Sequence, residues 1–275
     1  ALPIYGMNER VGGFSKVPSE DALLEIKEQL LKVQPTTVLA VNLLSGFTLP
    51  DYNVSDNVLL ALDSGAEFGY LGDHILTSDN ERIPEKEYES LTNESVNRHS
   101  YAKFSSYKDR PFMVGALPRL YFNHGKLKGT AAELYNEHGG LLDFRNTISN
   151  NLAQAIELVH DVEHSVKVID SLIDSGLENE GLVDFEVFES RGINAVEAPR
   201  GLLYHDYTFD GEGRITKSNI ITPTAQNAYN IEKDTRVIAG NLADKPVDEV
   251  KHALEIMVRA YDPCISCSVH VAQIK

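Results

Sequence analysis

Two long stretches of the chain place apolar residues at helical steps of three and four. In residues 19–33, Ser19 suits the N-cap position, and acidic residues follow in the first turn. The apolar stripe of this segment consists of Leu23, Ile26, Leu30 and Leu31. The pattern predicts an amphipathic helix over residues 19–33.

The longer periodic segment runs from about Thr147 to Ser175, and Gly176 suits the position after a helix C-terminus. Its stripe consists of Ile148, Leu152, Ile156, Val159, Val162, Val166, Ile169 and Leu172. Because amphipathic helices usually bury their apolar face, this stripe is expected to face the core rather than to bind a partner.

Shorter segments carry strand and turn patterns. Residues 181–189 alternate between apolar and polar side chains, which predicts a strand. Residues 206–222 predict a hairpin that turns at Asp210-Gly211 or at Gly213. Together with the two helices, these segments indicate a helix-rich α+β fold, with long core helices and small hairpin elements, in one domain over residues 1–275.

A last helix is expected from about Val247 to Ala260. Its apolar side consists of Val250, Leu254, Met257 and Val258. Asp262-Pro263 should end it, because proline disfavours the helical conformation in the residue before it.

Composition excludes some classes of partner. The chain has 275 residues, of which 42% are hydrophobic, enough for a sizeable core, and its formal net charge is −16. Such an acidic surface repels phosphate backbones and anionic lipids, so neither nucleic acid nor a membrane surface is expected as a partner. No run reaches the roughly 18 to 20 apolar residues of a membrane span, and the first residues lack the pattern of a secretory signal. We therefore expect a cytoplasmic protein.

The only two cysteines of the sequence are Cys264 and Cys267, both within the last dozen residues. Two thiolates three positions apart can bind one metal, and His270 could join them. A structural zinc site would need further, distant ligands, and an attached c-type haem would need CxxCH. Chemistry alone leaves open an incomplete metal site and a redox or inert pair.

Residues 262–270 read DPCISCSVH, and this DPCxxCxxH motif resembles the C-terminal signature of nickel–iron hydrogenase large subunits. Residues 197–201 read EAPRG, with His205 soon after, and are similar to another segment of that family. Residues 219–224 (NIITPT) resemble its stretch that ends in Pro-Ser/Thr.

Two further segments are similar to the soluble, cytoplasmic, multi-subunit branch: residues 99–104 (HSYAKF) and 12–16 (GGFSK). The matches follow the family's order over nearly the whole chain, and the tail closely resembles that of archaeal NADP-linked sulfhydrogenases. The resemblance implies the C-terminal portion of the hydrogenase large-subunit fold.

The resemblance also implies a site. Cys264 would be the terminal nickel thiolate and Cys267 the thiolate that bridges nickel and iron, with carbon monoxide and cyanide on the iron. Arg200 would project over the metals, Asp262 would join it in a charged canopy, and Thr224 would hydrogen-bond a cyanide. The pocket around the diatomic ligands would be lined by Pro199, Leu203, Thr222 and Pro223. These roles are physically reasonable, because a cyanide nitrogen in an apolar pocket needs hydrogen-bond donors.

A magnesium or iron ion near the C-terminus is also implied, with the His270 imidazole and the Ile220 backbone carbonyl among its ligands.

Purely structural roles are the alternative interpretation of several of these residues. Arg200 could be a surface or ion-paired arginine, and Thr224 could be an N-cap for the segment after Pro223. His160 and His164, four residues apart on the long helix, are expected on a solvated face.

The family's other two cysteines come from an N-terminal R-x-C-G-x-C motif, which this sequence lacks. The resemblance therefore implies that roughly the N-terminal third is absent. Either a second chain supplies it, or the sequence is a fragment, or the fold has lost hydrogenase activity. In the family a maturation chaperone and an endopeptidase act on the precursor. Cleavage would follow His270 and remove residues 271–275.

The expected function is part of a hydrogenase catalytic subunit that cleaves hydrogen heterolytically and reversibly. Cys264 is a better proton acceptor than Arg200, because an arginine guanidinium in a protein is a poor acceptor of protons. Electrons would leave through iron–sulfur clusters in a small subunit and reach NAD(P) through flavin-containing diaphorase subunits. The alternatives are a non-catalytic scaffold related to a complex I subunit and a small zinc or redox module.

Overall fold

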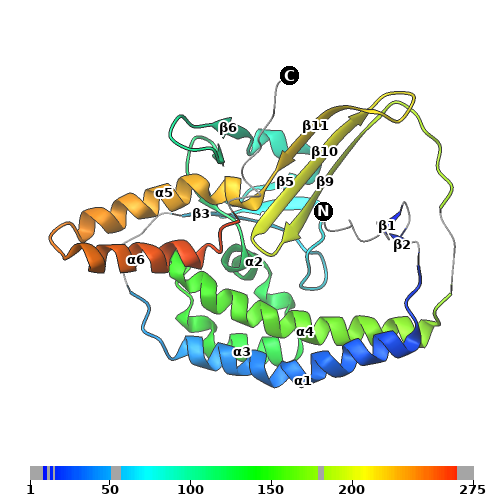
Figure 1. The fold of residues 1–275 in the computed structure, drawn as a ribbon, viewed down its shortest axis with the longest axis horizontal. Helices are drawn as coiled ribbons and strands as arrows, with labels where there is room; N and C mark the ends of the chain where they lie inside the picture. The colour runs from blue at the N-terminus through cyan, green and yellow to red at the C-terminus, as the bar shows by residue number, and fades with distance from the viewer. Residues whose placement is uncertain (1–8, 11–12, 15, 51–56, 179–182, 265–275) are drawn as a thin grey trace, which may run out of the picture.

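The computed structural model describes residues 9–10, 13–14, 16–50, 57–178 and 183–264. The predicted pair Cys264 and Cys267 straddles its last boundary, so Cys267, His270 and residues 271–275 lie outside the described residues. The observed architecture combines long helices with small sheets, which confirms the expected α+β class (Figure 1).

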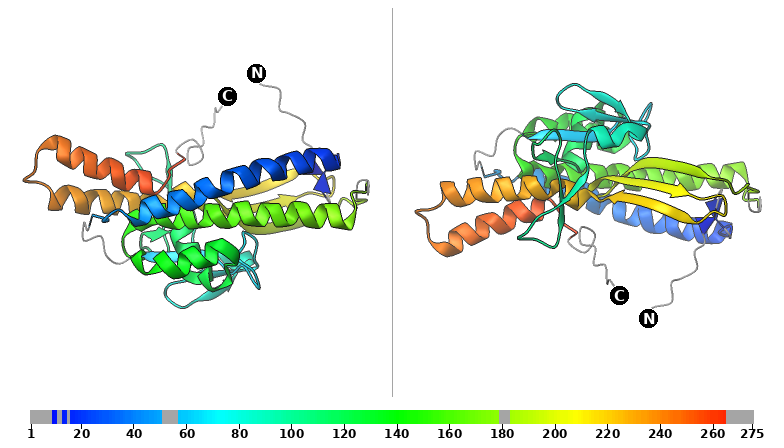
Figure 2. Two further views of the ribbon diagram at one scale, coloured as in Figure 1. Left: turned by 90° about the horizontal axis from the view of Figure 1, so that it is seen from below. Right: turned by 90° about the horizontal axis from the view of Figure 1, so that it is seen from above.

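Two long antiparallel helices, α1 (Glu20–Ser45) and α4 (Asn150–Ser175), form one side of the molecule (Figures 1 and 2). The Ser19 hydroxyl caps α1 by accepting a hydrogen bond from the Ala22 amide at 3.2 Å, as the sequence predicted. The helix continues through Pro35 well past the predicted end, because its inner face still packs on α4.

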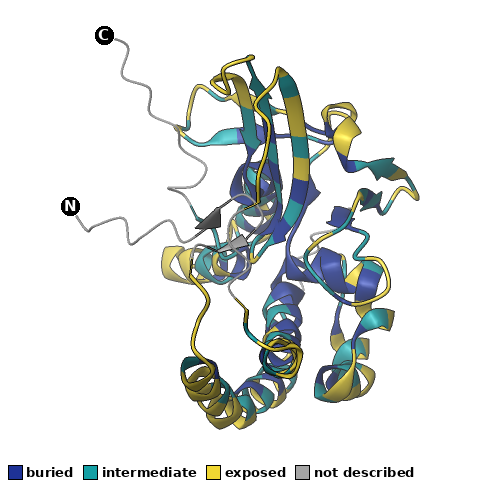
Figure 3. Cartoon of the chain, turned by 90° about the vertical axis from the view of Figure 1, so that its right-hand side faces the viewer, coloured by how far each residue is buried: buried dark blue, intermediate teal, exposed yellow. Residues whose placement is uncertain are grey.

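The α4 stripe faces the core as expected. Six of the eight apolar residues of the predicted stripe are buried, including Ile148, which lies just before α4. Val166 is half-buried, and Leu172 is exposed near the helix end. Gly176 ends the helix with a positive φ of 83°. Figure 3 shows buried residues concentrated between the helices and the sheets.

Short helices connect this pair to the rest of the fold. They are α2 (Ala116–Asn123), α3 (Gly129–His138) and the 3-10 turns η1 (Glu85–Ser90), η2 (His124–Lys126), η3 (Gly139–Leu141) and η4 (Thr147–Ser149). Helices α2 and α3 both pack on α4, and Leu117, Leu120, Ile156 and Val159 are among the residues of this core.

A four-stranded sheet with the order β5-β4-β3-β8 covers a second core. Its strands are β3 (Val58–Leu62), β4 (His74–Thr77), β5 (Arg82–Pro84) and β8 (Phe112–Met113), and β8 pairs with β3 in parallel. Two-stranded ribbons are formed by β1 (Glu9–Arg10) with β2 (Gly13–Phe14) and by β6 (Glu94–Val96) with β7 (Lys103–Ser105).

The antiparallel sheet β9 (Ser190–Ala198), β10 (Gly201–Phe209) and β11 (Ile215–Ile221) includes the predicted hairpin. Asp210 shapes its turn by accepting hydrogen bonds from two backbone amides, and Gly213 has a φ of +77°. The strand expected over residues 181–189 is wrong. Phe209, the last residue of β10, pairs with Ser190, so residues 183–189, the described part of this segment, have no neighbouring strand and are exposed.

Helices α5 (Pro223–Asn241) and α6 (Val247–Ala260) form a projecting hairpin, on the left of Figure 1. The bounds of α6 match the prediction, whereas the sequence reading anticipated α5 only as the segment after Pro223 that Thr224 would cap. In the described part of the chain, no helix is long and apolar enough to cross a membrane.

Candidate functional site

Arg200 and Asp262, which are 62 residues apart in the sequence, lie in direct contact. Arg200 occupies the tight turn between β9 and β10, and Asp262 follows the end of α6. Arg200 Nε lies 3.1 Å from Asp262 Oδ2, and Nη2 lies 3.4 Å from Oδ1. Nε also donates to the backbone carbonyl of Asp262. The guanidinium is therefore fixed to both the side chain and the main chain of the DPC segment.

The backbone at Asp262 turns sharply. Its φ is +48°, in the left-handed region that aspartate tolerates better than most residues. Helix α6 ends at Ala260 with Tyr261 as its C-cap, and Pro263 prevents the helix from continuing. The expectation that Asp262-Pro263 stops the last helix is confirmed.

Thr224 connects the same segment to α5. Its buried hydroxyl accepts a hydrogen bond from the Cys264 amide, with 3.0 Å between the two atoms. The alternative reading of Thr224 as an N-cap is wrong, because Thr222 is the N-cap residue and Pro223 begins the helix. As an acceptor in this bond, the Thr224 hydroxyl keeps its own hydrogen for a further acceptor.

A neighbouring hydroxyl has no hydrogen-bond partner among the described residues. Thr222 is buried, and its Oγ1 makes no hydrogen bond. A buried polar group without a hydrogen-bond partner costs about 1–3 kcal/mol. In native proteins such groups therefore often bind a water or an ion, or serve in catalysis. A ligand with acceptor atoms next to α5 would supply the missing partner.

The remaining predicted pocket residues are less closely gathered. Pro223 is buried beside Thr222, Leu203 is half-buried in β10, and Ile220 is the penultimate residue of β11. Pro199 is exposed and lines a cavity of about 400 Å³ on the side of α4. Among the described residues, no three histidine, cysteine, aspartate or glutamate side chains are placed to hold a metal. The second thiolate and the imidazole that the resemblance implies lie beyond Cys264.

A buried polar network anchors the start of the terminal segment. Asp234 Oδ2 accepts hydrogen bonds from the Tyr261 hydroxyl at 2.6 Å and from Thr147 Oγ1 at 2.8 Å. The Asn230 amide donates to the Tyr261 hydroxyl at 2.6 Å, and the Asn150 amide donates to the Ala260 carbonyl at 2.7 Å. Burial raises the pKa of Asp234, and the two hydroxyl donors oppose that rise. The network therefore holds Tyr261, the residue next to Asp262, in place.

Sequence reasoning missed this network, although a signal for it exists. Gln226, Asn230 and Asp234 recur every four residues, which places them on one face of a helix. All three are buried on α5. A polar stripe with helical spacing near a chemical motif would have identified both the helix and its supporting role.

A second buried cluster lies behind the Arg200 turn. Arg119 of α2 contacts Glu157 of α4 and Glu197 of β9, and all three side chains are almost fully buried. Burial raises the pKa of both glutamates, and the Arg119 guanidinium opposes that rise. His160, farther along α4, is buried and stacks on His164, which is exposed, so the expected solvated face is correct for His164 alone.

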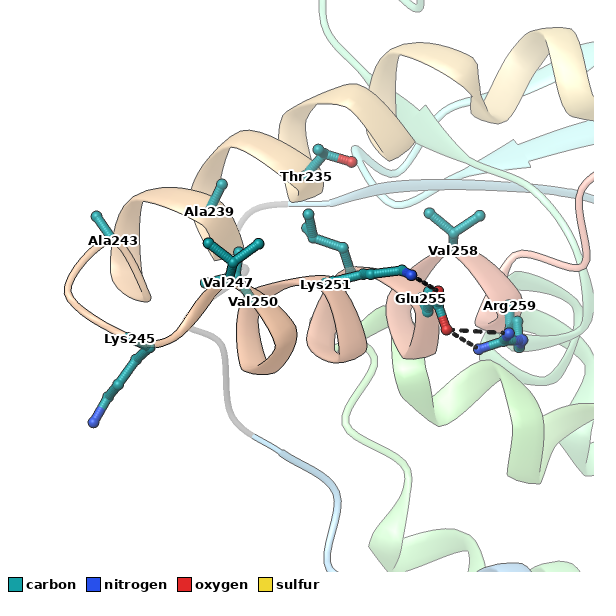
Figure 4. Close-up of a pocket in the computed structure, with 11 residues that line it drawn as sticks. Thr235, Ala239, Ala243, Lys245, Val247, Val250, Lys251, Glu255, Val258 and Arg259 are labelled. Carbon is teal, nitrogen blue, oxygen red and sulfur yellow. Dashed lines mark hydrogen bonds and ion pairs between the residues drawn. The ribbon is translucent and has the colours of Figure 1, made fainter.

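The α5–α6 hairpin carries a separate groove of about 840 Å³. Figure 4 shows its mainly apolar floor and the ion pairs from Glu255 to Lys251 and Arg259. None of the predicted site residues lines it.

The chain is similar to known proteins over most of its length. A family model described as nickel-dependent hydrogenase matches residues 66–270. Sulfhydrogenase 1 subunit alpha of Pyrococcus furiosus is 36% identical over 274 residues, which cover 98% of this chain and 63% of that protein. NAD-reducing hydrogenase HoxS subunit beta of Cupriavidus necator is 26% identical, with 97% of this chain and 61% of that protein covered.

A solved structure has the same fold. An NAD⁺-reducing [NiFe]-hydrogenase in the H₂-reduced state superposes with a TM-score of 0.81 at 23% identity, covering 94% of this chain and 62% of that chain. The present chain spans about three-fifths of the length of the curated relatives described above. Since the family model matches most of its length, the chain belongs to the nickel-dependent hydrogenase family.

Proposed function

We propose that this chain is part of the catalytic subunit of a [NiFe]-hydrogenase, which cleaves H₂ heterolytically and reversibly. One observation carries the proposal: the Arg200 turn, the start of α5 and the terminal segment converge at Cys264, through the Arg200–Asp262 and Thr224–Cys264 contacts. Because the chain spans three-fifths of its relatives, activity belongs to an assembly that contains the remaining part of the large subunit.

Cys264 and Cys267 would hold the metals, as the terminal and the bridging thiolate. When bound, nickel and iron with carbon monoxide and cyanide would supply the site that takes up and polarises hydrogen. The described residues suit part of such a centre. Thr224 keeps a hydroxyl hydrogen to donate, Thr222 has an unpartnered hydroxyl, and Arg200 supplies further donors for cyanide nitrogens.

The charged residues have distinct roles in this proposal. The Arg200 guanidinium would stabilise negative charge above the metals, while Asp262 holds the guanidinium in orientation. Cys264 Sγ accepts the proton that is released from hydrogen. Pro199, Leu203 and Pro223 would exclude water around the diatomic ligands.

The proposal also includes a second metal ion, a route for electrons and a maturation step. The Ile220 carbonyl and the His270 imidazole would bind a magnesium or iron ion. Electrons would pass to iron–sulfur clusters in a small subunit and then, through flavin-containing subunits, to NAD(P). The electron route is supported by the name of one relative, an NAD-reducing hydrogenase. A maturation chaperone would act before an endopeptidase cleaves after His270.

Metal analysis of the purified native complex tests the proposal. We expect nickel and iron, infrared bands of bound carbon monoxide and cyanide, and a segment that bears the second cysteine pair. Cys264→Ser should remove nickel and the bands, whereas Ser218→Ala, at an exposed position of β11, should leave both unchanged. Zinc alone, or no metal, would contradict catalysis and leave a scaffold relative of the family.

A further inference from the structure

We propose that Arg119 is the positioning residue that sets the orientation of Arg200. This inference rests on the proposed function, because it assigns Arg119 a role through the guanidinium above the metals. Arg119 lies in α2, and its side chain is only 2% exposed. Arg119 is therefore a buried residue and does not form a surface ion pair, and its contacts indicate its role.

All five N–H groups of Arg119 have acceptors. Nε and Nη2 donate to the two carboxylate oxygens of Glu157, at 2.6 and 2.7 Å. Nη1 donates to Glu197 Oε2 at 2.9 Å and to the Ala198 carbonyl at 3.0 Å. Nη2 donates its second hydrogen to the Pro199 carbonyl at 3.0 Å. Arg119 thus binds the side chain or the backbone carbonyl of each of the three residues before Arg200.

The turn is also fixed from its other sides. Glu197 Oε1 accepts from the Leu62 amide at 2.8 Å, so its carboxylate bridges Arg119 and β3. Gly201 has a φ of +127°, and a Cβ there would lie 2.4 Å from Val114 Cγ2. A Cβ on Gly115 would lie 3.3 Å from the Arg200 carbonyl oxygen. The turn is therefore pressed against the N-terminus of α2, the helix that carries Arg119.

This packing leaves little freedom at the backbone of Arg200, whose side chain then needs only Asp262 to complete its orientation. An ammonium group could keep the charge of Arg119 but could not reproduce the contacts, because lysine has three donors on one atom and lacks the planar fork. Arg119→Lys should therefore retain a charged partner for the glutamates and lose the two carbonyl contacts.

The experiment compares Arg119→Lys, Arg200→Lys and a control, Arg191→Lys, in the purified complex. Arg191 also holds a buried carboxylate with two hydrogen bonds, to Asp206 at 2.9 and 2.6 Å, but lies on β9 far along the strand from the turn. We expect Arg119→Lys to shift the cyanide bands in the same direction as Arg200→Lys. We also expect it to lower kcat at least tenfold with little change in KM for H₂. Arg191→Lys should lower Tm and leave bands and kcat at wild-type values.

Hydrogen exchange separates this inference from the proposed function. Arg119→Lys should speed amide exchange in residues 198–202, and Arg191→Lys should not. Unchanged exchange there, or wild-type bands and kcat with only a lower Tm, would overturn the positioning role. If the wild-type complex shows no carbon monoxide or cyanide bands, the proposed function fails, and the exchange data alone decide whether Arg119 positions the turn.

Discussion

Replacing Tyr261 by phenylalanine should weaken the fold at the point where the terminal segment begins. The substitution keeps the buried ring and removes the hydroxyl that donates to Asp234 at 2.6 Å and accepts from Asn230 at 2.6 Å. A hydrogen bond to a charged group contributes about 1.5–3 kcal/mol, and a buried amide left without an acceptor costs about 1–3 kcal/mol. Since Thr147 still donates to Asp234, we expect the free energy of unfolding to fall by roughly 3–5 kcal/mol.

Urea denaturation, followed by circular dichroism, measures this change as a lower midpoint with an unchanged m-value. Tyr101→Phe is the matched control, because Tyr101 is 92% exposed and should shift stability by no more than about 0.5 kcal/mol. If Tyr261→Phe unfolds at the same midpoint as Tyr101→Phe, the hydroxyl network contributes nothing, and the reasoning that it anchors Asp262 is refuted.

Three further changes should have distinct results. Gly201→Ala should destabilise by about 1–3 kcal/mol in the same denaturation assay, since its Cβ would lie 2.4 Å from a valine methyl carbon, whereas Gly211→Ala adds a Cβ with nothing within 4 Å. Burial lowers the pKa of His160, so the unfolded chain binds more protons than the folded chain just below pH 6.5, and stability should fall as pH falls through that region. His160→Gln should flatten this dependence in pH-resolved Tm measurements, and a slope that disappears only in His164→Gln would contradict the assignment. Thr224→Val removes the hydroxyl that accepts the amide hydrogen of the predicted nickel ligand, and we expect shifted cyanide bands; unchanged bands would place the hydroxyl away from the centre.

The sequence predicts a helix correctly where its apolar residues lie along one face at helical spacing. The α4 stripe and α6 satisfy that condition, so local periodicity was enough to find them. Helix α5 does not satisfy it, because its buried face includes Gln226, Asn230 and Asp234. The failure at residues 183–189 has a different cause. Alternation indicates that a segment can form a strand, but a strand also needs a neighbour, and the partner strand ends at Phe209.

The residues of the candidate site also differ in how far the sequence could predict them. Arg200 and Asp262 lie in recognisable motifs, and the structure brings them together. Arg119 lies in an ordinary amphipathic sequence, and its acceptors come from α4 and β9, 38 and 78 residues away. Contacts of this kind depend on tertiary packing, which one sequence does not reveal.

The groups that face the proposed metals and the groups that hold them should contribute differently to stability. The Arg200 and Asp262 side chains are 35% and 46% exposed, so their ion pair is worth about 0–1 kcal/mol. Arg119 and Glu197 are only 2% and 1% exposed, and breaking such a buried pair costs about 3–5 kcal/mol. Removal of a supporting residue therefore costs the fold more than removal of the exposed pair, because it leaves a buried charge uncompensated. The exposed pair can thus be tuned for chemistry at little cost to the fold. Variants of Arg200 should accordingly lose function while remaining folded, whereas neutral variants of Arg119 should lose both.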